Sequence, residues 1–118
     1  GQERWRFSTG AAVRAPPAIA PDGTVIVGSY DRHLYALTPA GEERWRLETS
    51  GRIRASARID PAGRIYVGSQ DDVLYAISLA GELLWSHNLG QDVDSTVAIG
   101  PEGTLYVGAD DGALHALR

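Results

Sequence analysis

The stretch DGTVIVGSYD at residues 22–31 decides the fold, because the chain carries it three times. It returns as AGRIYVGSQD at residues 62–71 and as EGTLYVGADD at residues 102–111, a shift of 40 residues each time. The same shift aligns three tryptophans and three glycines without a gap. A fixed period of this length is typical of proteins built from repeated supersecondary units. We therefore divide residues 1–118 into the repeats 1–40, 41–80 and 81–118, within a single structural segment.

Each repeat predicts four short strands and no helix. In the first repeat the strands are expected at 15–20, 24–29, 33–37 and 43–47, where β-branched or alternating apolar residues gather. The turn Pro21-Asp22-Gly23 separates the first two strands, since proline sets φ and glycine supplies a positive φ. Four short strands per 40 residues indicate an all-β protein made of propeller blades, each a four-stranded antiparallel sheet.

The repeat resembles the PQQ-like repeat of quinoprotein-type β-propellers. The resemblance rests on Ala18-Ile19, residues 22–31, Leu34-Tyr35-Ala36-Leu37, Gly41 and Trp45, and it covers the whole chain three times. Such repeats build the propellers of quinoprotein dehydrogenases, of an outer-membrane assembly lipoprotein, and of sensor regions on some bacterial kinases. The resemblance implies a bacterial protein of the cell envelope and places the Ile19 strand innermost. It leaves the function open, because the repeat residues are scaffold.

The number of blades and the strand missing from the third repeat predict how the chain assembles. Propellers have about four to eight blades, so three cannot close a ring. The third repeat ends after its third strand, while an extra tryptophan strand is expected at residues 3–8. We expect that strand to complete the last blade of a partner chain, which gives a six-bladed homodimer by strand exchange. Three chains with nine blades are the alternative, as is a segment cut from a longer propeller, which the start at Gly1 and the absence of methionine favour.

Composition excludes several classes of function. The chain has no cysteine, which removes disulfides and thiolate chemistry, and its net charge of −4 argues against a nucleic-acid partner. It has neither a run of about 18 apolar residues nor a signal-peptide pattern, so no membrane insertion is expected.

Charged residues at the channel mouth are the candidate binding surface. Arg14 and Arg54 lie in the loops that lead to the innermost strands, and Asp94, with Asp92 nearby, takes the equivalent place in the third repeat. In a twofold ring these positions would place four arginines and two aspartates on one face. They predict either a site for an anion or acidic peptide, or salt bridges that alternate between blades. Arg58, where other repeats have alanine, is expected to face the channel.

Other conspicuous residues are read as structural, and no catalytic residue, metal ligand or cofactor is assigned. The tryptophans are expected to pack between blades. Aspartates 31, 71 and 111 are expected to cap turns rather than bind calcium, which takes about six to eight oxygen ligands. The three histidines occupy unrelated repeat positions, so they predict no metal site.

We therefore expect a non-catalytic scaffold that binds protein through its loop face. That face comprises loops 9–14, 49–54 and 89–94 with turns 30–33, 70–73 and 110–113. One alternative is a fragment of a quinoprotein dehydrogenase that binds PQQ and calcium, although the chain lacks the insertions and cysteine pair of those enzymes. Another is an engineered or excised propeller fragment with no physiological ligand. The compartment stays open.

Overall fold

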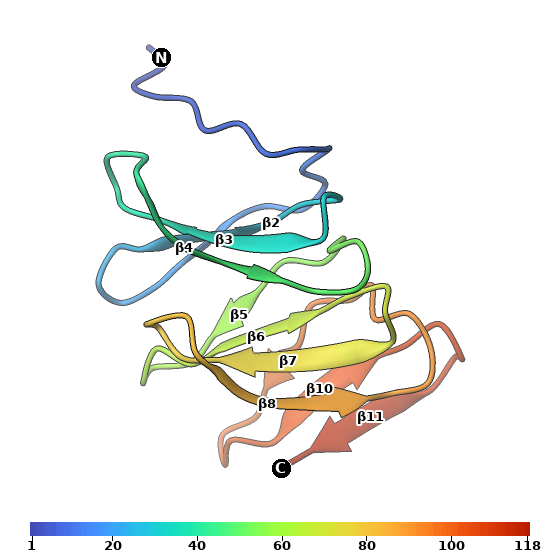
Figure 1. The fold of residues 1–118 in the computed structure, drawn as a ribbon. Helices are drawn as coiled ribbons and strands as arrows, with labels where there is room; N and C mark the ends of the chain where they lie inside the picture. Colours follow the sequence, from blue (N-terminus) through green and yellow to red (C-terminus); the bar gives the residue numbers. More distant parts are fainter.

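The computed structural model describes all 118 residues and contains eleven strands and no helix. The strands form three antiparallel sheets that follow one another along the chain (Figure 1). No helix in the structure has the length and apolar character to span a membrane.

The first two sheets have the same four-stranded layout. Their strands are β1 (Ala18–Ile19), β2 (Val25–Gly28), β3 (His33–Leu37) and β4 (Glu43–Glu48), followed by β5 (Arg58–Ile59), β6 (Ile65–Gly68), β7 (Val73–Ile77) and β8 (Leu83–Asn88). Each strand pairs with its neighbour in sequence, and the registers differ by 40: Leu34 opposes Leu47 as Leu74 opposes His87. The predicted strand order is therefore confirmed.

The third sheet has three strands, β9 (Ala98–Ile99), β10 (Leu105–Gly108) and β11 (Leu114–Leu117). One edge of β11 is unpaired, where β4 and β8 complete the other two sheets. In all three sheets the innermost strand has two residues rather than the predicted six. The prediction was too long because residues 15–17 and their equivalents approach the sheet as a loop without a paired neighbour.

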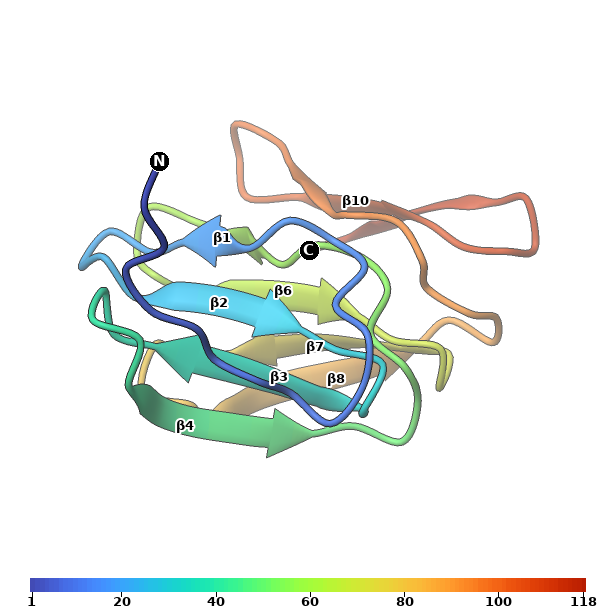
Figure 2. The ribbon, with the colours of Figure 1, turned by 90° about the horizontal axis from the view of Figure 1, so that it is seen from above.

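Residues 3–8 form no strand within this chain, so the expected strand that completes the last blade of a partner chain stays a prediction. These residues run beside the first sheet, on the side away from the second sheet (Figures 1 and 2), but form no ladder. The reason is that a strand needs a neighbour, and no unpaired strand lies next to them in this chain. They nevertheless occupy the place that β4 takes relative to the second sheet. The Trp5 indole Nε1 donates to Pro39 O at 2.9 Å, as that of Trp45 donates to Leu79 O at 3.0 Å. The predicted packing of tryptophan between blades is confirmed at both places.

The core lies in two layers, one between each pair of sheets. Successive side chains of β6 point to opposite faces of the sheet, so this strand contributes to both core layers. Ile65 and Val67 face the first sheet, and Tyr66 faces the third. All four residues of β6 are buried, because the middle sheet is covered on both faces. The outer face of the third sheet has no such cover, and Leu114 is 72% exposed where its equivalent Leu34 is fully buried. The outer face of the first sheet is partly covered by the segment at residues 3–8, where the Phe7 ring lies 5.3 Å from the Tyr35 ring.

Candidate functional site

The loops between successive sheets form a rim held by backbone hydrogen bonds. Ile53 N donates to Ser29 O of the first sheet at 3.1 Å, and Gln70 N of the second sheet donates to Arg52 O at 2.9 Å. The next loop repeats the pattern, because Val93 N donates to Ser69 O at 3.1 Å and Asp110 N to Asp92 O at 3.1 Å. Each loop is thus tied to the turn before it and the turn after it. Side chains on this rim are presented by an ordered backbone.

The repeated turn aspartates cap their turns, as predicted. Asp31 Oδ1 accepts from His33 N at 2.9 Å, and Asp71 Oδ1 accepts from Val73 N at 3.1 Å. Their second oxygens have a role that the sequence did not reveal, since Asp31 Oδ2 accepts from Gly10 N at 2.9 Å and from the Tyr35 hydroxyl. Asp71 does the same with Ser50 N and the Tyr75 hydroxyl.

The same contacts shift the pKa values of Tyr35 and Asp31. Burial and the adjacent Asp31 carboxylate raise the pKa of the Tyr35 phenol to about 12. Burial acts to raise the pKa of Asp31, but hydrogen bonds from the Tyr35 hydroxyl and the Gly10 amide outweigh it and hold that pKa below its ordinary value. Asp31 is therefore an ionised structural residue, and both Asp31 and Asp71 join a turn to the preceding loop.

The first part of the rim is basic and centred on Tyr30. The guanidinium carbons of Arg14 and Arg52 lie 5.5 and 5.2 Å from the centre of the Tyr30 ring, within the range of cation–π contact. Arg14, Arg52 and Arg54 are all exposed. Arg14 and Arg54 were predicted from the sequence, whereas Arg52 and Tyr30 were missed. A comparison of the repeats could have pointed to both residues, because the third repeat has aspartate at each equivalent position: Asp92 in place of Arg52, and Asp110 in place of Tyr30.

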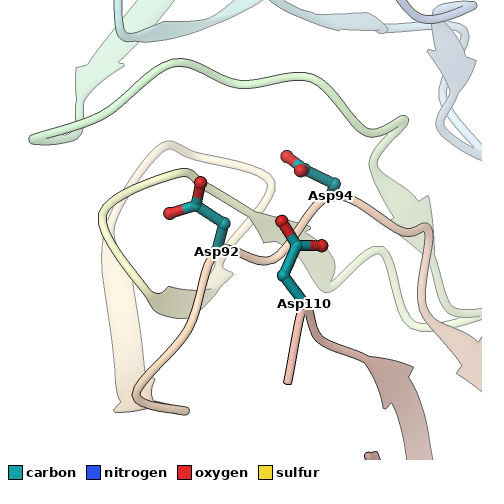
Figure 3. A group of neighbouring side chains, drawn as sticks. All are labelled: Asp92, Asp94 and Asp110. Atoms are coloured by element: carbon teal, nitrogen blue, oxygen red, sulfur yellow. The ribbon is translucent and has the colours of Figure 1, made fainter. Parts of the chain in front are cut away.

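The last part of the rim is acidic. The carboxylates of Asp92, Asp94 and Asp110 lie within 4.8 Å of one another, with Asp92 and Asp94 on the loop and Asp110 on the following turn (Figure 3). Asp94 Oδ1 also accepts from Gln70 Nε2 at 3.1 Å. Partial burial, the charge of Asp94 and further carboxylates at Asp72 and Asp110 raise the pKa of Asp92. Within the chain this cluster of negative charge has no cationic partner. The sequence predicted Asp92 and Asp94, and the structure adds Asp110.

Arg58 lies apart from the rim. It lines a hollow of about 760 Å³ formed by the inner strands and the proline turns, together with Ile19, Asp60 and Tyr66. None of Arg14, Arg54, Asp92 or Asp94 lines this hollow, so the structure does not bring the predicted residues into one site. The charge of Arg58 is exposed, while nearby Asp60 is buried and pairs with Arg64 at 2.7 Å.

The chemistry of the rim is that of charge recognition. Guanidinium groups bind carboxylates through paired hydrogen bonds, and an arginine stacked on an aromatic ring is already oriented for such a contact. The acidic cluster would in turn attract a cation or a basic side chain. Calcium takes about six to eight oxygen ligands. The three carboxylates supply fewer than that if each contributes one oxygen.

Comparisons with known proteins agree on the fold. A family model described as outer membrane protein assembly factor BamB matches residues 1–118. No curated protein matches the sequence. Among solved structures, the chain is similar to BamB from Moraxella catarrhalis, with 24% identity, a TM-score of 0.82, and coverage of 97% of this chain and 36% of that one. It is also similar to the WD40 β-propeller domain of Doa1, with 21% identity, a TM-score of 0.81, and coverage of 92% and 37%.

The chain thus spans about a third of the length of either solved structure, 36% and 37%. Both are propellers, so the three sheets are propeller blades and the predicted all-β fold is confirmed. The family match extends over the whole chain, which therefore belongs to the PQQ-like repeat family represented by the outer membrane protein assembly factor BamB.

Proposed function

We propose that the chain is a non-catalytic propeller module that binds an acidic protein segment on the basic part of its rim. The observation that carries the proposal is the cation–π contact of Arg14 and Arg52 with the Tyr30 ring, at 5.5 and 5.2 Å from its centre, with Arg54 exposed on the same loop as Arg52. Three arginines on an ordered loop face give a peptide carboxylate several planar hydrogen-bond donors.

The fold supports a scaffold or protein-binding role in general terms. The family description names an outer membrane protein assembly factor, and the WD40 domain shares the same blade architecture. Propellers present variable loops on a rigid sheet scaffold, which is where binding residues tend to lie. The rim of this chain has that form, since each loop between two sheets is tied to two turns by backbone hydrogen bonds, and the first loop is tied to one turn, where Tyr30 N donates to Ala12 O at 2.9 Å.

The experiment measures binding of a fluorescein-labelled peptide of ten glutamates by fluorescence anisotropy at low salt. Saturable binding is expected, and Arg54→Glu should weaken it by about tenfold, because it reverses one rim charge. Arg44→Glu is the matched control, since Arg44 is an exposed arginine on outer strand β4 and should leave binding unchanged. Absence of saturable binding, or equal loss in both variants, would overturn the proposed site.

A further inference from the structure

Three charged residues of the second sheet break the repeat. Arg58, Asp60 and Arg64 stand where both other repeats have small, uncharged residues. The equivalent residues are Ala18, Ala20 and Thr24 in the first repeat and Ala98, Gly100 and Thr104 in the third. Blade formation does not explain the three charges, because the first and third sheets form without them. They therefore indicate a feature that is particular to the middle sheet.

Strand pairing places these charges on one face of the second sheet. Arg58 opposes Tyr66 in the register of β5 and β6, and Asp60 N donates to Arg64 O at 3.0 Å just beyond those strands. Residues two positions apart on a strand point to the same side, as do directly opposed residues. Tyr66 belongs to the core layer between the second and third sheets. The charges therefore lie on the side of the second sheet that faces the third.

Asp60 is a buried carboxylate that holds the guanidinium of Arg64. Asp60 Oδ2 accepts from Arg64 Nε at 2.7 Å and from the Tyr66 hydroxyl at 3.2 Å. Asp60 Oδ1 accepts from the backbone nitrogens of Ala62 and Arg64, both at 2.9 Å. The Asp60 side chain is 6% exposed, whereas that of Arg64 is 58% exposed. Arg64 is therefore fixed at Nε, and its two terminal nitrogens make no hydrogen bond within the chain.

Both arginines line the hollow of about 760 Å³. It lies at the opposite end of the strands from the rim, because the rim loops enter the inner strands and the proline turns leave them. Asp60 is the one acidic residue that lines it, and both oxygens of Asp60 already accept hydrogen bonds. Arg58 forms neither an ion pair nor a side-chain hydrogen bond within the chain. The hollow therefore carries guanidinium donors that lack an acceptor.

The remaining walls of the hollow are largely apolar. Each inner strand contributes one isoleucine, and each following turn contributes a proline. The residues are Ile19, Ile59 and Ile99 with Pro21, Pro61 and Pro101. A volume of this size and a lining of apolar walls with a few convergent polar groups are typical of sites for small organic ligands.

We propose that this hollow binds the carboxylate of an organic acid that has an apolar body. Arg58 and Arg64 donate to the carboxylate, since guanidinium groups form paired hydrogen bonds with such planar anions. The isoleucines contact the apolar body. Asp60 acts as a positioning residue, because a guanidinium that is already held loses less freedom when the ligand binds. Two arginines and one aspartate leave a single positive charge, which matches one carboxylate. The inference does not rest on the proposed function, because the hollow and the rim share no residue.

The first experiment is isothermal titration calorimetry of residues 1–118 with hydrocinnamate, a carboxylate on a phenyl-bearing chain. Saturable binding is expected, and Arg58→Gln and Arg64→Gln should each weaken it by about tenfold. The neutral amide of the same acid should bind by about tenfold more weakly than the acid. Arg52→Gln is the matched control, because Arg52 lies on the rim and should leave binding unchanged. Absence of saturable binding, equal binding of acid and amide, or equal loss in Arg52→Gln would overturn the proposal.

The role of Asp60 is tested in two backgrounds. Asp60→Asn should weaken hydrocinnamate binding by about fivefold in the wild type and have no further effect in Arg64→Gln, because Asp60 acts through Arg64. Circular dichroism at the titration temperature checks that each variant is folded. Tyr66→Phe gives a milder test, since it removes one hydrogen bond to Asp60 and keeps the ring. Equal losses in both backgrounds would overturn the positioning role.

A peptide identifies the source of the carboxylate. The tetrapeptide Gly-Ala-Ala-Leu is titrated with a free and with an amidated carboxyl terminus. Tighter binding of the free form than of hydrocinnamate would assign the hollow to the carboxyl terminus of a protein or peptide. Binding of hydrocinnamate alone would assign it to a free organic acid. Arg58→Gln should leave binding of the glutamate peptide to the rim unchanged, so failure of this site and failure of the proposed function can be told apart.

Discussion

Gly81 lies against the indole ring of Trp45: a Cβ at Gly81 would sit 2.7 Å from Trp45 Cγ. Gly41 has the same relationship to Trp5, at 2.5 Å from Cδ2. The tryptophan of each repeat therefore packs on the glycine turn of the next one, which joins successive blades.

Replacing Gly81 by alanine should destabilise the fold through this contact. Gly81 has φ of 91° and Gly103 has φ of 84°, so both substitutions strain the backbone in the left-handed region. Only Gly81→Ala also displaces a tryptophan, because nothing lies within 4 Å of a Cβ at Gly103. We expect Gly81→Ala to lower the free energy of unfolding by about 2 kcal/mol more than Gly103→Ala. Urea denaturation followed by tryptophan fluorescence measures the difference, and equal losses would show that the packing contributes nothing.

The Tyr35 hydroxyl should stabilise the turn through its bond to Asp31. Tyr35→Phe removes a hydrogen bond to a half-buried carboxylate and should cost about 2 kcal/mol in the free energy of unfolding. Tyr30→Phe is the control, because the Tyr30 hydroxyl makes no hydrogen bond within the chain. Absorbance titration of the phenols should also lose a component near pH 12 in Tyr35→Phe, as the raised pKa of Tyr35 implies. An unchanged titration curve would contradict this assignment.

Asp60 should make the free energy of unfolding depend on pH. Burial acts to raise the pKa of Asp60, but hydrogen bonds from the Arg64 amide and guanidinium and from the Tyr66 hydroxyl outweigh it and lower that pKa below its ordinary value. Since the folded pKa is depressed, the contribution is complete above the unfolded pKa of about 3.9 and is lost as the pH falls through the folded value.

The corresponding variant is Asp60→Asn. At pH 7 the free energy of unfolding of the wild type should be about 2 kcal/mol larger than that of Asp60→Asn. This difference should disappear as the pH falls below about 4. Denaturation series at pH 7, 5, 4 and 3 measure the gap. A gap that is constant across this series would show that the charge of Asp60 is not responsible.

Two equivalent glycines should give different results on substitution. Gly68→Ala places a methyl group 2.2 Å from Val93 Cγ1 and should lower the free energy of unfolding by about 3 kcal/mol. Gly108→Ala meets only the Ser95 hydroxyl at 3.4 Å within the chain, so the fold should tolerate it. Urea denaturation of both variants measures the difference, and equal losses would show that the contact with Val93 contributes nothing.

The sequence predicted the strands well because their signals are local. Turns at Gly23, Gly63 and Gly103 have positive φ, as the Pro-x-Gly pattern predicts, and the tryptophans pack between blades. The prediction failed where pairing decides the outcome. Residues 15–17 have strand-like composition but no partner. Residues 3–8 match β4 in pattern, and their pairing with another chain stays a prediction.

The candidate site was predictable only in part. Arg14, Arg54, Asp92 and Asp94 stand out because they differ in charge at equivalent loop positions. The stack of Arg52 on Tyr30 and the approach of Asp110 to Asp94 join residues from loops and turns 16 to 22 positions apart. Such contacts depend on how one blade sits on the next, which local pattern does not specify. Arg58 was predicted apart from this set, as a residue that faces the channel, and it lines the hollow formed by the inner strands and the proline turns.

The sequence by itself determined the period, the strand order and the residues that turn the chain, since these follow from proline and glycine dihedrals and from apolar alternation over a few residues. Only the tertiary structure decided that the rim is basic at Tyr30 and acidic at Asp110. The physical reason is that these features arise where one blade packs on another, and both sides of a contact must be positioned before its charge and shape exist.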